Sequence, residues 1–186
     1  MRKMFVKTEN YRKFVSAVKA VEQRGAAEAG MMLVYGVPGL GKSHIVSSWA
    51  AETGAIFLRA NKDWTPRYAL SELAAALEID GRGNSQKLFA RLLKPIAANQ
   101  WPIVIDEAEF TLANQAASLE KIRDISDRAE NTVILIGMGN IQNDIKRYGQ
   151  ISSRIARVVE FLPATLEDVQ SACKQLAEVE MSPELM

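Results

Sequence analysis

The segment Gly36-Val37-Pro38-Gly39-Leu40-Gly41-Lys42-Ser43 decides the fold of this chain. It has the form G-x-x-x-x-G-K-S, in which backbone N–H groups turn inward around a phosphate. Glycines let the backbone approach because no Cβ stands in the way. Lys42 can then reach the β- and γ-phosphates, and the Ser43 hydroxyl can ligate Mg²⁺. The pattern therefore predicts a phosphate-binding loop.

The flanking sequence agrees with this prediction, which requires a strand before the loop and a helix after it. Residues 31–35 form an apolar run suited to a buried strand, and residues 42–53 have apolar side chains on one helical face. The first-turn N–H groups of that helix would face the phosphates. His44 lies in this turn beside the bound nucleotide, and a structural role for it is favoured over a catalytic one. A glycine-rich turn that binds nothing is the alternative.

Length and composition are those of a globular protein with one core. The chain has 186 residues, 48% of them apolar, and a net charge of +1, so no overall basic field indicates nucleic acid. Residues 1–24 are basic and residues 160–186 are acidic, which fits either solvated helices or phosphate contacts near the N-terminus. The single cysteine, Cys173, excludes an intramolecular disulfide and fits a reducing cytoplasm. No apolar run reaches membrane-spanning length, so no membrane partner is expected.

Strand and helix patterns alternate along the chain and predict an α/β fold. Strands are expected at residues 31–35, 55–59, 101–106, 132–136 and 157–161. Helices are expected at residues 8–24, 42–53, 66–77, 85–98, 115–128 and 140–148, and from 165 onward. This alternation indicates a five-stranded, mostly parallel sheet covered by helices on both faces.

Asp106 and Glu107 end the third predicted strand, at the edge where ligands of open α/β sheets bind. Asp106 would hold Mg²⁺ opposite Ser43, and Glu107 would act as general base on the attacking water. Glu109 is a weaker candidate for this chemistry, and a charge at the start of a helix is the favoured interpretation. The acidic pair, with a separate strand between it and the P-loop strand, favours the ATPase branch of P-loop proteins over kinases and GTPases.

Two further polar residues are candidates for the hydrolytic site. Asn140 follows the fourth strand and could orient the water or contact the γ-phosphate, or it could cap the next helix. Arg154 precedes the last strand and could reach the γ-phosphate of a neighbouring subunit. Arg147 and Arg157 are rivals for that role, and an ordinary surface arginine is the alternative.

A basic-aromatic cluster follows the second strand. It consists of Arg59, Lys62, Trp64 and Arg67. The composition suits a nucleic-acid backbone, with Trp64 stacking on a base. An ordinary exposed loop explains it nearly as well.

The motifs, in this order and spacing, resemble those of an AAA+ ATPase of the ASCE class of P-loop proteins. They are Gly36–Ser43, Ile103–Glu107, Met138-Gly139-Asn140 and Ser153-Arg154-Ile155-Ala156. Within AAA+ proteins the chain is similar to the transposition ATPases typified by the phage Mu B protein. The segments Phe5-Val6-Lys7-Thr8 and Leu119-Glu120-Lys121-Ile122-Arg123 carry that finer resemblance.

The resemblance implies an ATP- and Mg²⁺-dependent ATPase that assembles into a ring or helical filament on double-stranded DNA. It would select target DNA and stimulate a transposase, in a bacterial or phage-infected cytoplasm. By motif, Lys42 and Ser43 would be Walker A, Asp106 and Glu107 Walker B, Asn140 sensor 1 and Arg154 the interface arginine. A helicase loader acting in DNA replication and an AAA+ switch that does not bind DNA are the alternatives.

The resemblance also predicts the domain organisation. Residues 1–163 would form the ATPase core, and residues 164–186 the start of a truncated or minimal helical lid. Only the first lid helix fits before Met186, so no sensor-2 residue is assigned.

Overall fold

The computed structural model describes residues 5–23 and 29–176 and contains a five-stranded, all-parallel sheet of order β2-β3-β4-β1-β5. The strands are β1 (Met31–Tyr35), β2 (Ile56–Arg59), β3 (Ile103–Asp106), β4 (Val133–Gly137) and β5 (Ile155–Glu160). β4 pairs with both β1 and β3, so a strand separates the P-loop strand from the Asp106 strand as predicted. The predicted α/β class is confirmed.

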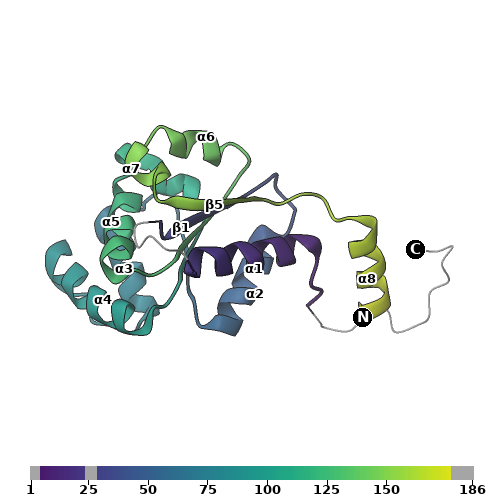
Figure 1. The fold of residues 1–186 in the computed structure, drawn as a ribbon. Coiled ribbons are helices and arrows are strands. Elements are labelled where there is room, and N and C mark those ends of the chain that lie inside the picture. The colour runs from purple at the N-terminus through teal and green to yellow at the C-terminus, as the bar shows by residue number, and fades with distance from the viewer. Residues whose placement is uncertain (1–4, 24–28, 177–186) are drawn as a thin grey trace.

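Helices cover both faces of this sheet (Figure 1). α1 (Glu9–Glu22) and α2 (Lys42–Thr53) cover one face, and α3 (Pro66–Ala76), α4 (Ser85–Asn99) and α5 (Ala113–Ala129) cover the other. The remaining helices are η1 (Ala108–Leu112), α6 (Ile141–Lys146), α7 (Gly149–Ser152) and α8 (Leu166–Leu176).

Alternating side chains of the central strands separate the two cores. In β1, Met31 and Leu33 face the core under α3, α4 and α5, whereas Met32 and Val34 pack with α1 and α2. The period of two is that of any strand, and both sets are apolar because helices bury both faces. This burial on both faces explains why the strands are continuous apolar runs in the sequence.

The structure differs from the predicted elements after β3 and β4. The short helix predicted over residues 140–148 is α6, and a second short helix that was not predicted, α7, follows it, because Tyr148 leaves the helical region with φ −111° and ψ 86°. After β3 the chain forms the 3₁₀ helix η1, and then three residues, Asn114, Gln115 and Ala116, adopt left-handed angles before α5 continues. Neither feature has a hydrophobic period that the sequence could reveal.

α8 is attached to the N-terminal segment. The Asn10 side-chain amide donates to the carbonyl of Leu162 (2.8 Å) and accepts from its N–H (3.2 Å). Asp168 accepts the N–H of Glu9 (2.8 Å) and that of Thr165 (3.2 Å). Of the predicted lid, residues 177–186 lie outside the described residues. Within residues 5–23 and 29–176, no helix has the length and apolarity needed to cross a membrane.

We expect Asp168→Asn to destabilise the attachment of α8. Burial alone would raise the pKa of Asp168, but the hydrogen bonds from Glu9 and Thr165 and the nearby Arg12 charge lower it. Asparagine keeps one acceptor oxygen but places an NH₂ group against one of the two backbone N–H donors. The free energy of unfolding, measured with urea at pH 7, should therefore fall by about 1–3 kcal/mol. The pKa of Asp168 is lower in the folded than in the unfolded protein. The difference in free energy of unfolding between wild type and Asp168→Asn should therefore be largest above the ordinary pKa range of aspartate. It should disappear as the pH falls through the pKa of Asp168 in the folded protein.

The matched control is Asp63→Asn, which alters an exposed aspartate in the loop after β2. Equal stabilities of wild type and Asp168→Asn at pH 7 would contradict the assignment.

Candidate active site

The P-loop joins the carboxyl end of β1 to the amino end of α2. Gly41 is the N-cap of α2 with φ 74° and ψ 16°, a left-handed conformation that costs other residues energy. No side chain caps this helix, so its first-turn N–H groups are available to an anion. The local geometry is that predicted from the G-x-x-x-x-G-K-S pattern.

Lys42 lies over this loop. Its Nζ donates to the carbonyl oxygens of Gly36 and Val37, each at 2.9 Å. Burial lowers the pKa of Lys42, although the Glu109 and Asp106 carboxylates act in the opposite sense. An anionic phosphate at the loop would add a favourable partner for the ammonium group.

Ser43 and Asp106 meet across the site as predicted. The Ser43 hydroxyl donates to Asp106 Oδ1 at 3.0 Å, and the Asp106 side chain is 4% exposed. A hydroxyl and one carboxylate, completed by phosphate oxygens and water, are a donor set that suits Mg²⁺. Among residues 5–23 and 29–176 no cluster of three or more His, Cys, Asp or Glu side chains could hold a metal.

Glu107 leaves the line of β3 immediately after Asp106. Its backbone is left-handed, with φ 55° and ψ 42°, and its N–H donates to Asp106 Oδ1 at 3.0 Å. Its side chain is 44% exposed, and Arg59 Nε lies 3.9 Å from Glu107 Oε1. A half-exposed carboxylate beside the metal position can contact a water molecule, as a general base requires.

Two hollows adjoin at the P-loop and share Gly39, Gly41 and His44. The first has a volume of about 250 Å³ and is lined by Lys42, Ser43 and the acidic side chains after β3. The second has a volume of about 430 Å³ and lies between the N-terminal segment and α8, with mainly apolar walls. Lys42 and Ser43 line only the first hollow, so this is the one in which phosphates would bind.

Asn140 does not line either hollow. It is exposed, three residues beyond the end of β4, and its side chain makes no capping hydrogen bond to α6. The walls contributed by this stretch are Gly137 and Met138. The contact of Asn140 with the γ-phosphate stays a prediction, whereas the alternative role as a side-chain cap of α6 is not seen.

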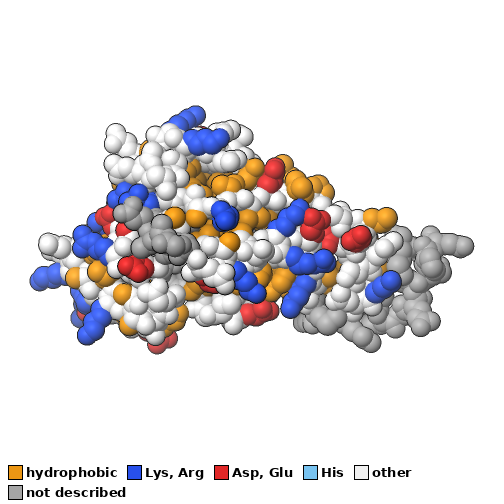
Figure 2. Space-filling view, viewed as in Figure 1, with side chains coloured by type: hydrophobic (Ala, Val, Ile, Leu, Met, Phe, Trp, Pro, Cys, Tyr) orange, Lys and Arg blue, Asp and Glu red, His pale blue; other side chains and the backbone are white. Residues whose placement is uncertain are grey.

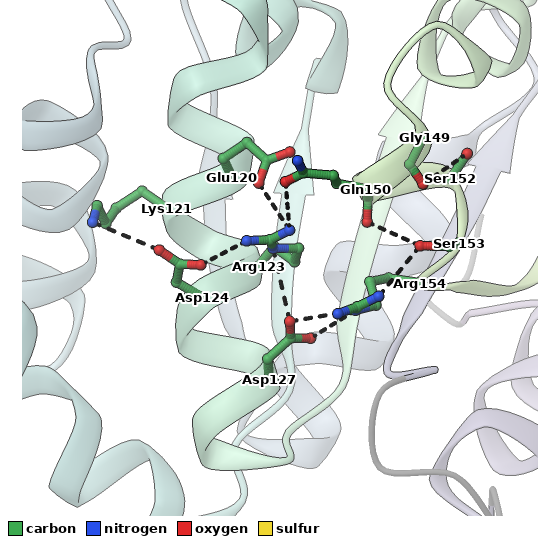
Figure 3. A network of polar contacts seen from close by, with 10 residues as sticks. All are labelled: Glu120, Lys121, Arg123, Asp124, Asp127, Gly149, Gln150, Ser152, Ser153 and Arg154. Carbon is green, nitrogen blue, oxygen red and sulfur yellow. Dashed lines mark hydrogen bonds and ion pairs between the residues drawn. The ribbon is translucent and has the colours of Figure 1, made fainter.

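Arg154 lies at the opposite end of the sheet from the P-loop. Its carbonyl oxygen accepts a hydrogen bond from the N–H of Met31, the first residue of β1. Arg154 therefore lies at the amino ends of the strands. Its Nε contacts both carboxylate oxygens of Asp127, at 3.2 and 3.3 Å, within the network drawn in Figure 3. Arg123 also contacts Asp127, at 3.7 Å. Arg154 therefore cannot serve the phosphate site of its own chain.

The predicted DNA contacts are not a single exposed cluster. Trp64 is 2% exposed within the core, so the expectation that it stacks on a base is wrong; its carbonyl accepts from Ser118. Arg67 donates to the carbonyls of Gly81 and Gly83, which ties α3 to the loop before α4. Lys62 alone of the four lies exposed in the loop.

Arg59, for which a DNA contact is predicted, has a side chain that is 62% exposed and contacts the acidic pair after β3. In the parallel register it is the partner of Asp106, and its Nη2 donates to Asp106 Oδ2 at 3.2 Å. The sequence could have indicated this contact only through the expectation that the strands ending at Arg59 and Asp106 lie side by side. Glu109, the weaker carboxylate candidate of the sequence, lies in the first turn of η1 as expected and also lines the phosphate hollow.

We expect Lys42→Ala to weaken binding of a fluorescent ATP analogue by at least about 100-fold, because a charge-assisted contact to phosphate is lost. Titration at fixed Mg²⁺ measures this, with Lys94→Ala on the exposed face of α4 as control. Equal affinities of Lys42→Ala and wild type would refute the site.

The comparisons agree with this geometry. No curated protein matches the sequence. Among solved structures, the chain is similar to the Walker-type ATPase PABY2304 of Pyrococcus abyssi (TM-score 0.69, 16% identity, 96% of this chain and 60% of that one). It is also similar to the Orc1 protein of Aeropyrum pernix in complex with DNA (TM-score 0.63, 18% identity, 95% of this chain and 50% of that one). A third similar structure is domain III of the Thermotoga maritima replication initiation protein DnaA (TM-score 0.56, 15% identity, 97% of this chain and 75% of that one).

These identities show the fold, and the chain spans 60% and 50% of the first two relatives. A family model described as an AAA domain matches residues 24–143, most of the chain and all of the segment from the P-loop to Asn140. The chain therefore belongs to the family that this model describes, the AAA domain.

Proposed function

We propose that this chain is an ATP-dependent DNA-binding AAA+ ATPase that self-associates on duplex DNA and regulates transposition. The observation that carries the ATPase part is the phosphate hollow, where Lys42, the Ser43–Asp106 pair and Glu107 converge. In this proposal the residues act on ATP and Mg²⁺ as predicted from their motifs. When bound, Mg²⁺ would neutralise charge on the β- and γ-phosphates.

Self-association is supported by exposed apolar side chains and by Arg154. The former lie on β5, on the following linker and on α8: Val158, Leu162, Leu166 and Val169, between 41% and 68% exposed. β5 is an edge strand, and apolar side chains at such an edge favour contact with another protein surface. An arginine remote from its own phosphate site can complete the site of a second copy.

DNA binding has weaker support from the surface. In Figure 2, Lys and Arg side chains are spread over several elements with Asp and Glu between them. Support comes instead from the resemblance to transposition ATPases and from the Orc1 structure, which was solved in complex with DNA.

A replication role, such as helicase loading, is the second candidate. The observation in its favour is the similarity to the replication initiation protein DnaA. The transposition role rests on the segments at residues 5–8 and 119–123, which include Arg123 of the network in Figure 3. In that network the neighbouring carboxylates, Asp124 first, outweigh burial and raise the pKa of Arg123.

The experiment that separates these functions uses Glu107→Gln, which should bind ATP but hydrolyse it about 10²- to 10⁴-fold more slowly than wild type. The variant is mixed with ATP and duplex or single-stranded DNA at low salt and viewed by electron microscopy. Filaments or rings on duplex support the transposition proposal, and a preference for single strands supports helicase loading. Binding should weaken as salt rises, because phosphate contacts release counterions. Absence of DNA binding at low salt would contradict both proposals and leave a switch that does not bind DNA.

We also expect Arg154→Ala to lower hydrolysis in the assembled state by up to about 10³-fold while leaving ATP affinity intact. Asp127→Ala is the matched control, because it breaks the same ion pair but keeps the arginine. Mixing Arg154→Ala with Glu107→Gln subunits tests action between subunits, since each variant can supply the group that the other lacks. An effect of Arg147→Ala in place of Arg154→Ala would move the role to Arg147.

A further inference from the structure

Glu109 places a second carboxylate in the phosphate hollow. It lies in η1, one residue beyond Ala108, and lines the hollow together with Lys42, Asp106 and Glu107. Its Oε2 atom is buried and has no hydrogen-bond partner among the described residues. A buried, unpaired carboxylate oxygen is costly, and such atoms are normally satisfied by water or a ligand.

The end of β4 is shaped around this side chain. A Cβ atom added to Gly137 would lie 2.9 Å from Glu109 Oε2 and 2.4 Å from Ile141 Cδ1. No side chain larger than hydrogen therefore fits at position 137 without displacing its neighbours. Since Asn140 lies outside the hollow, the polar group beside the end of β4 is the carboxylate of Glu109.

The charges of the hollow indicate what Glu109 can bind. A carboxylate does not accept a hydrogen bond from a fully ionised phosphate, and the two repel each other. Water can donate to it, and the opposite wall holds Lys42, whose ammonium group is the candidate partner of the phosphates. The part of the Glu109 carboxylate that lines the hollow would then accept from a water molecule, and this water would lie between Glu109 and the γ-phosphate.

We propose that Glu109 is a second carboxylate of the hydrolytic site, which accepts a hydrogen bond from the attacking water and orients it toward the γ-phosphorus. This inference rests on the ATP hydrolysis proposed above. In the step, a bond forms between the water oxygen and the γ-phosphorus, and the bond from this phosphorus to the β,γ-bridging oxygen breaks. The water proton passes to Glu107, and the products are ADP and phosphate.

The test compares Glu109→Gln with Glu52→Gln, a matched substitution on the exposed face of α2. Glutamine has the size of glutamate, so a purely structural role would survive the change. We expect kcat to fall about 10- to 100-fold in Glu109→Gln while KM and the affinity for a fluorescent ATP analogue stay within about threefold of wild type. Hydrolysis by Glu109→Gln at the rate of Glu52→Gln would overturn the inference.

A second measurement does not depend on turnover. ADP with aluminium fluoride mimics the transition state, including the attacking water, whereas ADP with beryllium fluoride mimics bound ATP. Glu109→Gln should weaken the aluminium fluoride complex about tenfold or more and leave the beryllium fluoride complex unchanged. Equal affinity losses for the two complexes, or no loss, would overturn the inference. A wild type that binds both complexes but does not hydrolyse ATP would contradict the proposed function and this inference with it. A wild type that hydrolyses ATP, with Glu109→Gln unchanged, would overturn this inference alone.

Discussion

The parallel register around β4 is the constraint on which the rest of the structure depends. Val133 is level with Met31 of β1 on one side and with Ile103 of β3 on the other. The two strands therefore end at similar heights, and their carboxyl ends deliver the P-loop and Asp106 to one edge of the sheet. The 3.0 Å contact between Ser43 and Asp106 follows from this register, although the two residues are far apart in the sequence.

The apolar hollow depends on a different set of contacts, because its walls come from both ends of the described chain. Phe5 and Val6 lie on one side, and Ala172 and Leu176 of α8 lie on another. The reciprocal hydrogen bonds of Asn10 with Leu162 hold these segments together. A base in this hollow would contact the N-terminal segment and α8 at once, so its binding and the position of α8 would be linked.

The two ends of the sheet have different chemistry. The carboxyl ends carry the lysine, hydroxyl and carboxylates of a phosphate site, and the amino ends carry Arg154 with Asp127 (Figure 3). Since one chain cannot bring these ends together, an arginine acting on phosphate requires a second copy. The proposed self-association would bring Arg154 of one copy to the phosphate site of another.

The sequence by itself determined the α/β class, all five strands to within about two residues, and the P-loop with Asp106, because these depend on local periodicity and on backbone geometry near glycine. Only the tertiary structure decided where the side chains between these motifs point. Trp64 is buried because α3 and α5 close over it, Arg59 reaches Asp106 through strand pairing, and Glu109 fills the space beside Gly137. Such placements depend on residues distant in the sequence, and no local pattern records which neighbour will pack against a given side chain.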